Sequence, residues 1–205
     1  MTTDRRLSIL AFCILICSVG AYPSEQGAGQ SVAKDVSSLY SENARIQAEA
    51  ASRLIATGPS AISQLVPVVC DRARPHFDVA WPVAARILGE LRAEAAAPCL
   101  VDMLMYKYPS IGTVVTKSDE TLAGVDSAFA ALLRIGEPAV PAIRKRIPFL
   151  GPEPAIMALR VLRAINTPSA REASEAYLKV LQDQIRFTKQ VLRDFGHETG
   201  GNPGR

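Results

Sequence analysis

The chain has few aromatic residues: its 205 residues include five Tyr, six Phe and one Trp, whereas alanine occurs 30 times. This bias favours close-packed helices over a β-sandwich, because sandwich strands are rich in aromatic and β-branched residues. The formal net charge is only +3 and 48% of the residues are hydrophobic. These values exclude a disordered or strongly polyionic chain. We therefore expect an all-α globular protein.

Catalytic and metal-binding motifs are also missing. The sequence contains no G-x-S-x-G, H-E-x-x-H, G-x-x-x-x-G-K or C-x-x-C motif. His76 and His197 are far apart in the sequence, and neither has a Cys or another His at ligand spacing. We therefore expect no enzyme activity, no cofactor and no metal. The small net charge gives no reason to expect a nucleic-acid partner.

The first 21 residues have the order of a secretory signal peptide. Arg5 and Arg6 precede an apolar run from residue 7 to residue 19, and small residues follow up to Ala21. Cleavage after Ala21 fits this pattern. The apolar run is shorter than the roughly 20 residues that span a bilayer, so we expect no stable membrane span. The sequence predicts a signal peptide at 1–21 and an exported protein, either periplasmic or secreted.

Cysteine is scarce in the part that would remain after cleavage. Removal of residues 1–21 takes away Cys13 and Cys17, neither of which follows the small residue of a lipobox, and leaves Cys70 and Cys99. Outside a reducing cytosol these two could form one disulfide. Each lies in a helical stretch, however, where cysteine is equally at home as a small hydrophobic residue. At this point we favour two unbridged cysteines.

One pattern recurs along the chain: an Ala/Leu-rich helical run, a turn with Gly or Asn, and a second helical run that often has Pro in its first turn. The turn residues of the four copies are Gly58, Gly89, Gly136 and Asn166. Gly, and sometimes Asn, adopts the left-handed backbone that ends a helix at little cost. Prolines expected at helix starts are Pro82, Pro98, Pro141, Pro154 and Pro168. Pro67 lies inside a run, where it should kink the helix or mark a later start.

The third copy, GEPAVPAI from Gly136 to Ile143, resembles the HEAT or HEAT-like (PBS-lyase-type) repeat. The resemblance extends over about Ala44 to Leu181. It implies an αα-solenoid of about four helix pairs. The tetratricopeptide alternative requires Trp and Tyr at fixed places, which the single Trp81 does not provide. We interpret Trp81 as a packing anchor. A non-repeating helix bundle is the second alternative.

The expected organisation is a signal peptide (1–21), a flexible lead-in (22–40), a HEAT-like domain (41–195) and a disordered tail (196–205). The domain ends in a long helix, 169–195, whose apolar residues are spaced by three and four: Leu178, Leu181, Ile185, Leu192 and Phe195. A solenoid needs an element to cover its last hydrophobic face, and this helix is the candidate. The alternative is a coiled-coil dimer. Thr188 in the seam and the small number of heptads favour the cap, and with it a monomer.

The resemblance implies a non-catalytic scaffold that binds a protein partner. Alternatives are a catalytic HEAT-like protein, since some act as lyases, and a purely structural envelope subunit. Arg144, Lys145 and Arg146 lie on a second helix, in the layer that lines the inner surface of HEAT-like solenoids, and suit an acidic protein segment or an anionic envelope polymer. Solvated arginines are the simpler interpretation. Tyr106 and Tyr108 begin a long connection that breaks the repeat, and they are a second candidate surface.

Overall fold

The computed structural model describes residues 25–106 and 118–199. Within these ranges every regular element is a helix, which confirms the all-α class. The predicted signal peptide and Tyr108 lie outside the described residues. The α-helices are α1 (Glu25–Ser38), α2 (Ala44–Thr57), α3 (Ile62–Cys70), α4 (Phe77–Glu90), α5 (Ala97–Asp102), α7 (Asp119–Val125), α8 (Ser127–Ile135), α9 (Val140–Arg146), α10 (Pro152–Ile165) and α11 (Pro168–Thr199). Short 3₁₀ helices are η1 (Gly58–Ala61), η2 (Glu94–Ala96), η3 (Glu137–Ala139) and η4 (Ile147–Phe149).

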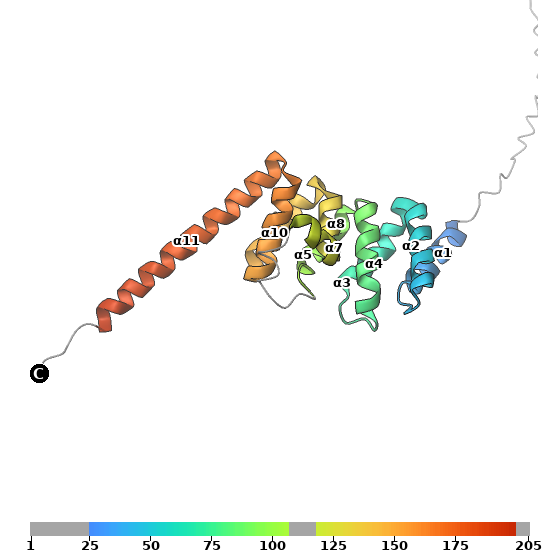
Figure 1. Ribbon diagram of the computed structural model, residues 1–205, viewed down its shortest axis with the longest axis horizontal. Coiled ribbons are helices and arrows are strands. Elements are labelled where there is room, and N and C mark those ends of the chain that lie inside the picture. Colours follow the sequence, from blue (N-terminus) through green and yellow to red (C-terminus); the bar gives the residue numbers. More distant parts are fainter. Residues whose placement is uncertain (1–24, 107–117, 200–205) are drawn as a thin grey trace, which may run out of the picture.

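Four pairs of consecutive helices follow one another along the long axis of the molecule (Figure 1): α2 with α3, α4 with α5, α8 with α9, and α10 with α11. The first helices contact each other in this order, α2 on α4, α4 on α8, and α8 on α10. The second helices do the same, α3 on α5, α5 on α9, and α9 on α11. Each pair therefore shares apolar surface with the next, and the core is continuous along the row of pairs.

Two of the predicted turns have the same backbone conformation. Gly58 ends α2 and Gly136 ends α8, each with a φ of +74° and with ψ angles of −148° and −140°. L residues avoid this region because of their Cβ atom. A 3₁₀ turn with proline at its second position begins at Gly58 and another directly after Gly136, and each leads into the second helix. Asn166 ends α10 in the left-handed region, with φ +53°, as predicted.

The second copy differs from the prediction. Gly89 is not a turn residue, because α4 continues to Glu90, and Arg92 instead adopts the positive φ of +50°. A Cβ atom at Gly89 would lie 2.9 Å from the Cα of Ala131 in α8. The missing side chain therefore lets α4 and α8 pack closely, which is a tertiary requirement that the repeat pattern does not reveal.

The prolines follow the prediction with one exception. Pro98, Pro141, Pro154 and Pro168 lie within the first turn of their helices. Pro82 does not, since α4 begins five residues earlier. Its neighbours Ala80, Trp81 and Ala84 are buried in the core, and this packing outweighs the cost of a proline inside the helix. Pro67 likewise lies within α3, which begins at Ile62.

The expected flexible lead-in (22–40) and disordered tail (196–205) are both partly helical. From Glu25 onward the predicted flexible lead-in is the helix α1, whose residues Val32 and Val36 are buried, together with Leu39 just after it. The carboxylate of Asp35 accepts a hydrogen bond of 2.9 Å from Nε of Arg53, which joins α1 to α2. At the other end, α11 continues through residue 199, past the predicted start of the tail at 196. In both places helical periodicity extends into a polar, Gly-containing sequence.

The last helix covers its neighbours only with its first turns. Ala170 and Ala173 are buried, and Tyr177 is partly buried against the core. From there α11 extends away from the other helices, as the orange to red helix of Figure 1 shows. We call residues 178–195 the distal segment, and the rest of the described chain, up to Tyr177, the body.

Candidate functional site

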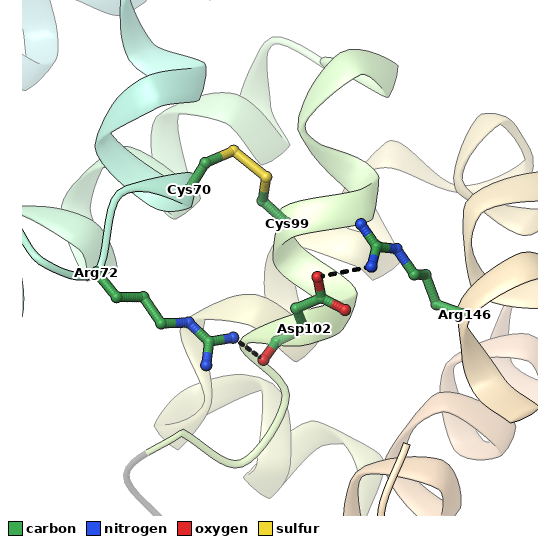
Figure 2. Close-up of a disulfide and its surroundings, with 5 residues drawn as sticks. All are labelled: Cys70, Arg72, Cys99, Asp102 and Arg146. Carbon is green, nitrogen blue, oxygen red and sulfur yellow. Dashed lines mark hydrogen bonds and ion pairs between the residues drawn. A yellow bond between two sulfur atoms is a disulfide. The ribbon is translucent and has the colours of Figure 1, made fainter. Parts of the chain in front are cut away.

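Cys70 and Cys99 form a disulfide that joins the end of α3 to α5, with a Cα–Cα distance of 5.2 Å (Figure 2). Our preference for unbridged cysteines was therefore wrong. The two residues are 29 positions apart in the sequence, and only the contact between α3 and α5 brings them together. Cys70 is exposed and Cys99 partly so, which places the disulfide at the surface and not in the core.

Asp102, the last residue of α5, holds two arginines beside this disulfide (Figure 2). Its backbone carbonyl accepts a hydrogen bond from the guanidinium of Arg72, and its carboxylate lies 3.2 Å from Nη1 of Arg146. The three residues connect the segment after α3, the end of α5 and the end of α9. The charge of Arg146 is thus compensated within the protein.

Arg144, Lys145 and Arg146 belong to a basic stretch between residues 134 and 163, and most of its charges are compensated in the same way. Arg144 lies 3.2 Å from the carboxylate of Glu172 in α11. The remaining arginines of the stretch 134–163 pair with Glu90 and Asp119, in the pairs Arg134–Glu90, Arg160–Asp119 and Arg163–Asp119. Lys145 is exposed and has no carboxylate partner among the described residues. The arginines of this stretch therefore form ion pairs, and Lys145 is its one basic residue without a carboxylate partner in the described part of the chain.

Asp119 is the most constrained of these carboxylates, because it receives both Arg160, at 2.6 Å, and Arg163, at 3.0 Å. Burial raises the pKa of Asp119, but the hydrogen bonds from Arg163 and Arg160 outweigh it and hold the pKa below its usual range. Through this cluster the start of α7 is fixed to α10.

Lys145 lies on the wall of a groove between the beginnings of α5 and α9. One depression of about 660 Å³ is lined by Glu94, Ala95, Pro98, Pro138, Pro141, Ala142 and Lys145. A second, of about 460 Å³, is lined by Pro98, Ala142, Lys145, Arg146 and Phe149. Because both contain Pro98, Ala142 and Lys145, they are parts of one groove, which we call the α5–α9 groove. Its lining is mainly apolar, and Phe149, at one end, is 86% exposed.

The geometry of α9 divides the three predicted basic residues. Lys145 and Arg146 line the α5–α9 groove, whereas Arg144 pairs with α11. Adjacent helix positions are separated by about 100°, so three consecutive side chains cannot all face one partner. Sequence reasoning singled out the charges here but missed the apolar component of the groove. The signal in the sequence for this apolar surface was the recurrence of proline at the beginning of successive second helices.

Tyr106, the other described candidate, is part of an aromatic cluster. Its ring makes edge-to-face contacts with Phe77 and Trp81, at centroid distances of 5.8 and 6.0 Å. The guanidinium of Arg72 lies 5.5 Å from the same ring. Trp81 is 4% exposed, which confirms its interpretation as a packing anchor. Tyr106 remains 41% exposed, and its contacts give it a structural role whether or not it binds a partner.

Asp126 is a buried carboxylate that the sequence analysis did not single out. It caps the N-terminus of α8, accepting a hydrogen bond of 2.9 Å from the backbone N–H of Phe129 and one of 3.0 Å from that of Met105. Burial raises the pKa of Asp126, against the opposing effect of these backbone hydrogen bonds. Its position directly before an apolar helical run was the available signal. Its hydrogen bonds with described residues all come from backbone N–H groups, which indicates a structural role.

The described residues include no group of three or more His, Cys, Asp and Glu side chains placed to hold a metal ion. None of the described helices is both long enough and apolar enough to cross a membrane. No protein-family model, curated protein or solved structure matches the chain significantly. What the groove binds is therefore inferred from its own geometry and chemistry.

Proposed function

We propose that this protein is an exported HEAT-like αα-solenoid that binds a protein partner without catalysis, through the α5–α9 groove. The recurrent helix–turn–helix pairs support the solenoid, because first helices contact first helices and second helices contact second helices along the chain. The identical backbone at Gly58 and Gly136 supports a true repeat, since a non-repeating bundle has no reason to use one turn twice.

The observation that carries the binding proposal is an open, mainly apolar groove that contains Lys145, which has no carboxylate partner in the described part of the chain; Glu94 lines the same groove. Pro98, Pro138 and Pro141 form a rigid apolar lining, and they leave no side-chain donors or acceptors to be satisfied. An exposed phenylalanine at one end, Phe149, adds apolar surface that a partner would cover. Lys145 then fixes the position of a negative charge along the groove.

The partner that fits this surface is an extended, mainly apolar protein segment with one acidic side chain opposite Lys145. A polyanionic polymer is a poorer fit, because Arg144 and Arg146 are already paired with Glu172 and Asp102. When a partner with a single carboxylate binds, only one lysine, Lys145, loses its hydration. The salt dependence of binding should accordingly be shallow, as expected for one ion pair.

A peptide-display selection against the purified protein tests this proposal. We expect enrichment of extended peptides with apolar residues and one Asp or Glu, and we expect Lys145→Glu and Phe149→Ser each to weaken binding of an enriched peptide by about tenfold. Fluorescence anisotropy measures the affinity. Lys34→Glu is the matched control, since Lys34 is an exposed lysine on α1, outside the groove.

Two results would contradict the proposal. If Lys145→Glu and Phe149→Ser bind as well as the parent protein, the groove is not the binding surface. If the groove variants abolish turnover of a small molecule, the catalytic alternative takes the place of the scaffold. An unchanged circular-dichroism spectrum in both variants ensures that the loss of binding does not come from unfolding.

Export is part of the same proposal. The disulfide between Cys70 and Cys99 supports an oxidising compartment, because structural disulfides are rare in reducing cytosol. Mass spectrometry of the protein from its native host provides the test. We expect a mature chain that begins at Tyr22 and has lost two protons at the cysteine pair. An intact Met1 with two free thiols would contradict export.

A further inference from the structure

We infer that the Cys70–Cys99 disulfide is a thiol-exchange site, at which a small thiol with an acidic group becomes covalently attached to Cys70. The two cysteines form part of the wall of a pocket with a volume of about 480 Å³. Pockets of this size hold small molecules. We call it the disulfide pocket, and its lining residues are Val69, Cys70, Arg72, Cys99, Asp102 and Leu150. Exchange at this site is independent of protein binding at the α5–α9 groove.

The disulfide is accessible from solvent. Cys70 is exposed and Cys99 is partly exposed, although Val69, which precedes Cys70, and Leu100, which follows Cys99, are fully buried. Buried disulfides are shielded from thiols, whereas exposed disulfides are the labile ones. Because both cysteines line the disulfide pocket, a thiol bound there reaches the sulfur atoms while the protein stays folded.

Arg72 gives the disulfide pocket its preference for an acidic thiol. Its guanidinium donates a hydrogen bond to the backbone carbonyl of Asp102 and lies 5.5 Å from the centre of the Tyr106 ring. Neither contact neutralises the guanidinium, and no carboxylate in the described part of the chain forms an ion pair with it. The carboxylate of Asp102 is itself paired with Arg146 at 3.2 Å (Figure 2). The pocket therefore presents a positive charge, which attracts an anionic group.

The exchange needs no oxidant or reductant other than the thiol itself. The thiolate of the incoming molecule attacks Sγ of Cys70, and a new S–S bond forms as the bond between Cys70 and Cys99 breaks. The electron pair of the broken bond goes to Sγ of Cys99, which leaves as a thiolate and then takes a proton from water. The product has one mixed disulfide at Cys70 and one thiol at Cys99, so the number of disulfides is unchanged.

Two features make Cys70 the attacked residue and Cys99 the leaving one. Cys70 is the more accessible of the two to an incoming thiolate. It is also the last residue of α3, where a leaving thiolate would lie at the negative end of the helix dipole. Cys99 is the third residue of α5, so a thiolate at this position avoids that repulsion.

Other contacts hold α3 and α5 in place when the disulfide opens. Leu100 and Val101 of α5 are fully buried in the core, and Asp102 at the end of α5 is paired with Arg146 of α9. Val69, near the end of α3, is also fully buried. Burial of these apolar side chains stabilises both helices whether or not the sulfur atoms are joined. The two cysteines can therefore separate without unfolding of the protein.

Mass spectrometry of the folded, disulfide-bonded protein tests the exchange with two small thiols. 3-Mercaptopropionate carries a carboxylate, and 2-mercaptoethanol is neutral. Acid stops each reaction by protonating the thiolates, and peptic digestion in acid then locates the adduct. We expect a mixed disulfide on Cys70, a free thiol on Cys99 and an unchanged circular-dichroism spectrum.

Variants of Arg72 test the preference for an acidic thiol. The quantity to compare is the rate at which the intact disulfide disappears with 3-mercaptopropionate, divided by the rate with 2-mercaptoethanol, because the intrinsic reactivities of the thiols then cancel between variants. Arg72→Gln should lower this ratio by about threefold, the effect of one exposed ion pair, and added salt should lower it in the parent protein. Arg72→Lys is the matched control, since it keeps the positive charge but loses the planar guanidinium, and it should retain the ratio.

Three results would overturn the thiol-exchange site. Equal ratios for the parent protein and Arg72→Gln would exclude the preference for an acidic thiol. A disulfide that stays intact until urea unfolds the protein would exclude exchange in the folded state. An adduct on Cys99 would exclude Cys70 as the attacked residue. Peptide binding at the α5–α9 groove is measured separately, so failure here leaves the proposed function intact.

Discussion

The body and the distal segment of α11 show one kind of amphipathic helix in two situations. In the body, Leu162 of α10 is fully buried between neighbouring helices, whereas Leu192 of the distal segment is 66% exposed. Both residues belong to regular three- and four-residue apolar spacings. The difference lies in the neighbours, since α10 packs against α8 and α11, whereas Leu192 lies in the part of α11 that extends away from the other helices (Figure 1). An apolar stripe therefore predicts a helix face but not what covers that face.

The body and the distal segment also differ in the size of the residues on their helix surfaces. In the body, α4 and α8 meet at Gly89 and Ala131, where there is no room for another methyl group. The apolar residues of the distal segment are instead the large Leu, Ile, Val and Phe, and the segment contains no Gly or Ala. A small residue at a helix contact thus reflects the close approach of a neighbouring helix.

The largest effect expected from this comparison is a difference between two Leu→Ala substitutions. Leu162→Ala should lower the free energy of unfolding by about 3 kcal/mol, because it leaves a cavity in the core. Leu192→Ala should change it by less than about 0.5 kcal/mol in the monomer. Urea denaturation at low protein concentration measures both. Similar midpoints for the two variants would mean that the distal segment packs against the body in solution.

A second substitution tests the close contact of α4 with α8. Gly89→Ala should destabilise the protein by about 2 kcal/mol, because its Cβ would lie 2.9 Å from the backbone of Ala131 and force the helices apart. Gly124→Ala is the control, as a Cβ atom at this position in α7 has no neighbour within 4 Å. The control should be neutral or slightly stabilising. Thermal unfolding of both variants is the measurement. Equal melting temperatures for Gly89→Ala and Gly124→Ala would show that α4 and α8 can move apart without loss of stability.

A smaller effect is expected at the repeated turn. Gly136→Ala should cost about 1 kcal/mol, because the φ of +74° is unfavourable for any residue with a Cβ atom although space is available there. Gly58→Ala should cost a similar amount, since the two turns share one conformation. Urea midpoints of the two variants provide the comparison. A large difference between them would mean that the two turns are not equivalent.

The smallest effect concerns pH. The pKa of Asp119 is lowered in the folded protein, so its ion pairs stabilise the fold above the pKa of the unfolded state and lose this effect as the pH falls through the folded pKa. Asp119→Asn should therefore cost up to about 1 kcal/mol at pH 7 and less below pH 4. Unfolding measured at both pH values gives the difference. If the difference in unfolding free energy between the parent protein and Asp119→Asn grows as the pH falls, the pKa of Asp119 is shifted in the opposite direction.

The helix class and most helix ends could be predicted from the sequence because they depend on local interactions. Gly58, Gly136 and Asn166 adopt positive φ angles that follow from their own steric properties, and prolines at helix starts follow from the missing N–H. Errors occurred where local preference was overruled. Glycines and polar residues in the first turns of α1 indicated a flexible segment, yet Val32 and Val36 are buried against the neighbouring helices.

Tertiary structure alone decided which residues meet. The bond between Cys70 and Cys99 needed the contact of α3 with α5, and the neutralisation of Arg144 and Arg146 needed Glu172 and Asp102, which are distant in the sequence. Local patterns hold no information about such pairs, because the distance between two helices depends on the whole chain. The sequence by itself determined most of the helices, the turns at Gly58, Gly136 and Asn166, and the apolar spacing of α11. Packing determined that Lys145 has no carboxylate partner among the described residues and that Leu192 is exposed, because both depend on where the other helices lie.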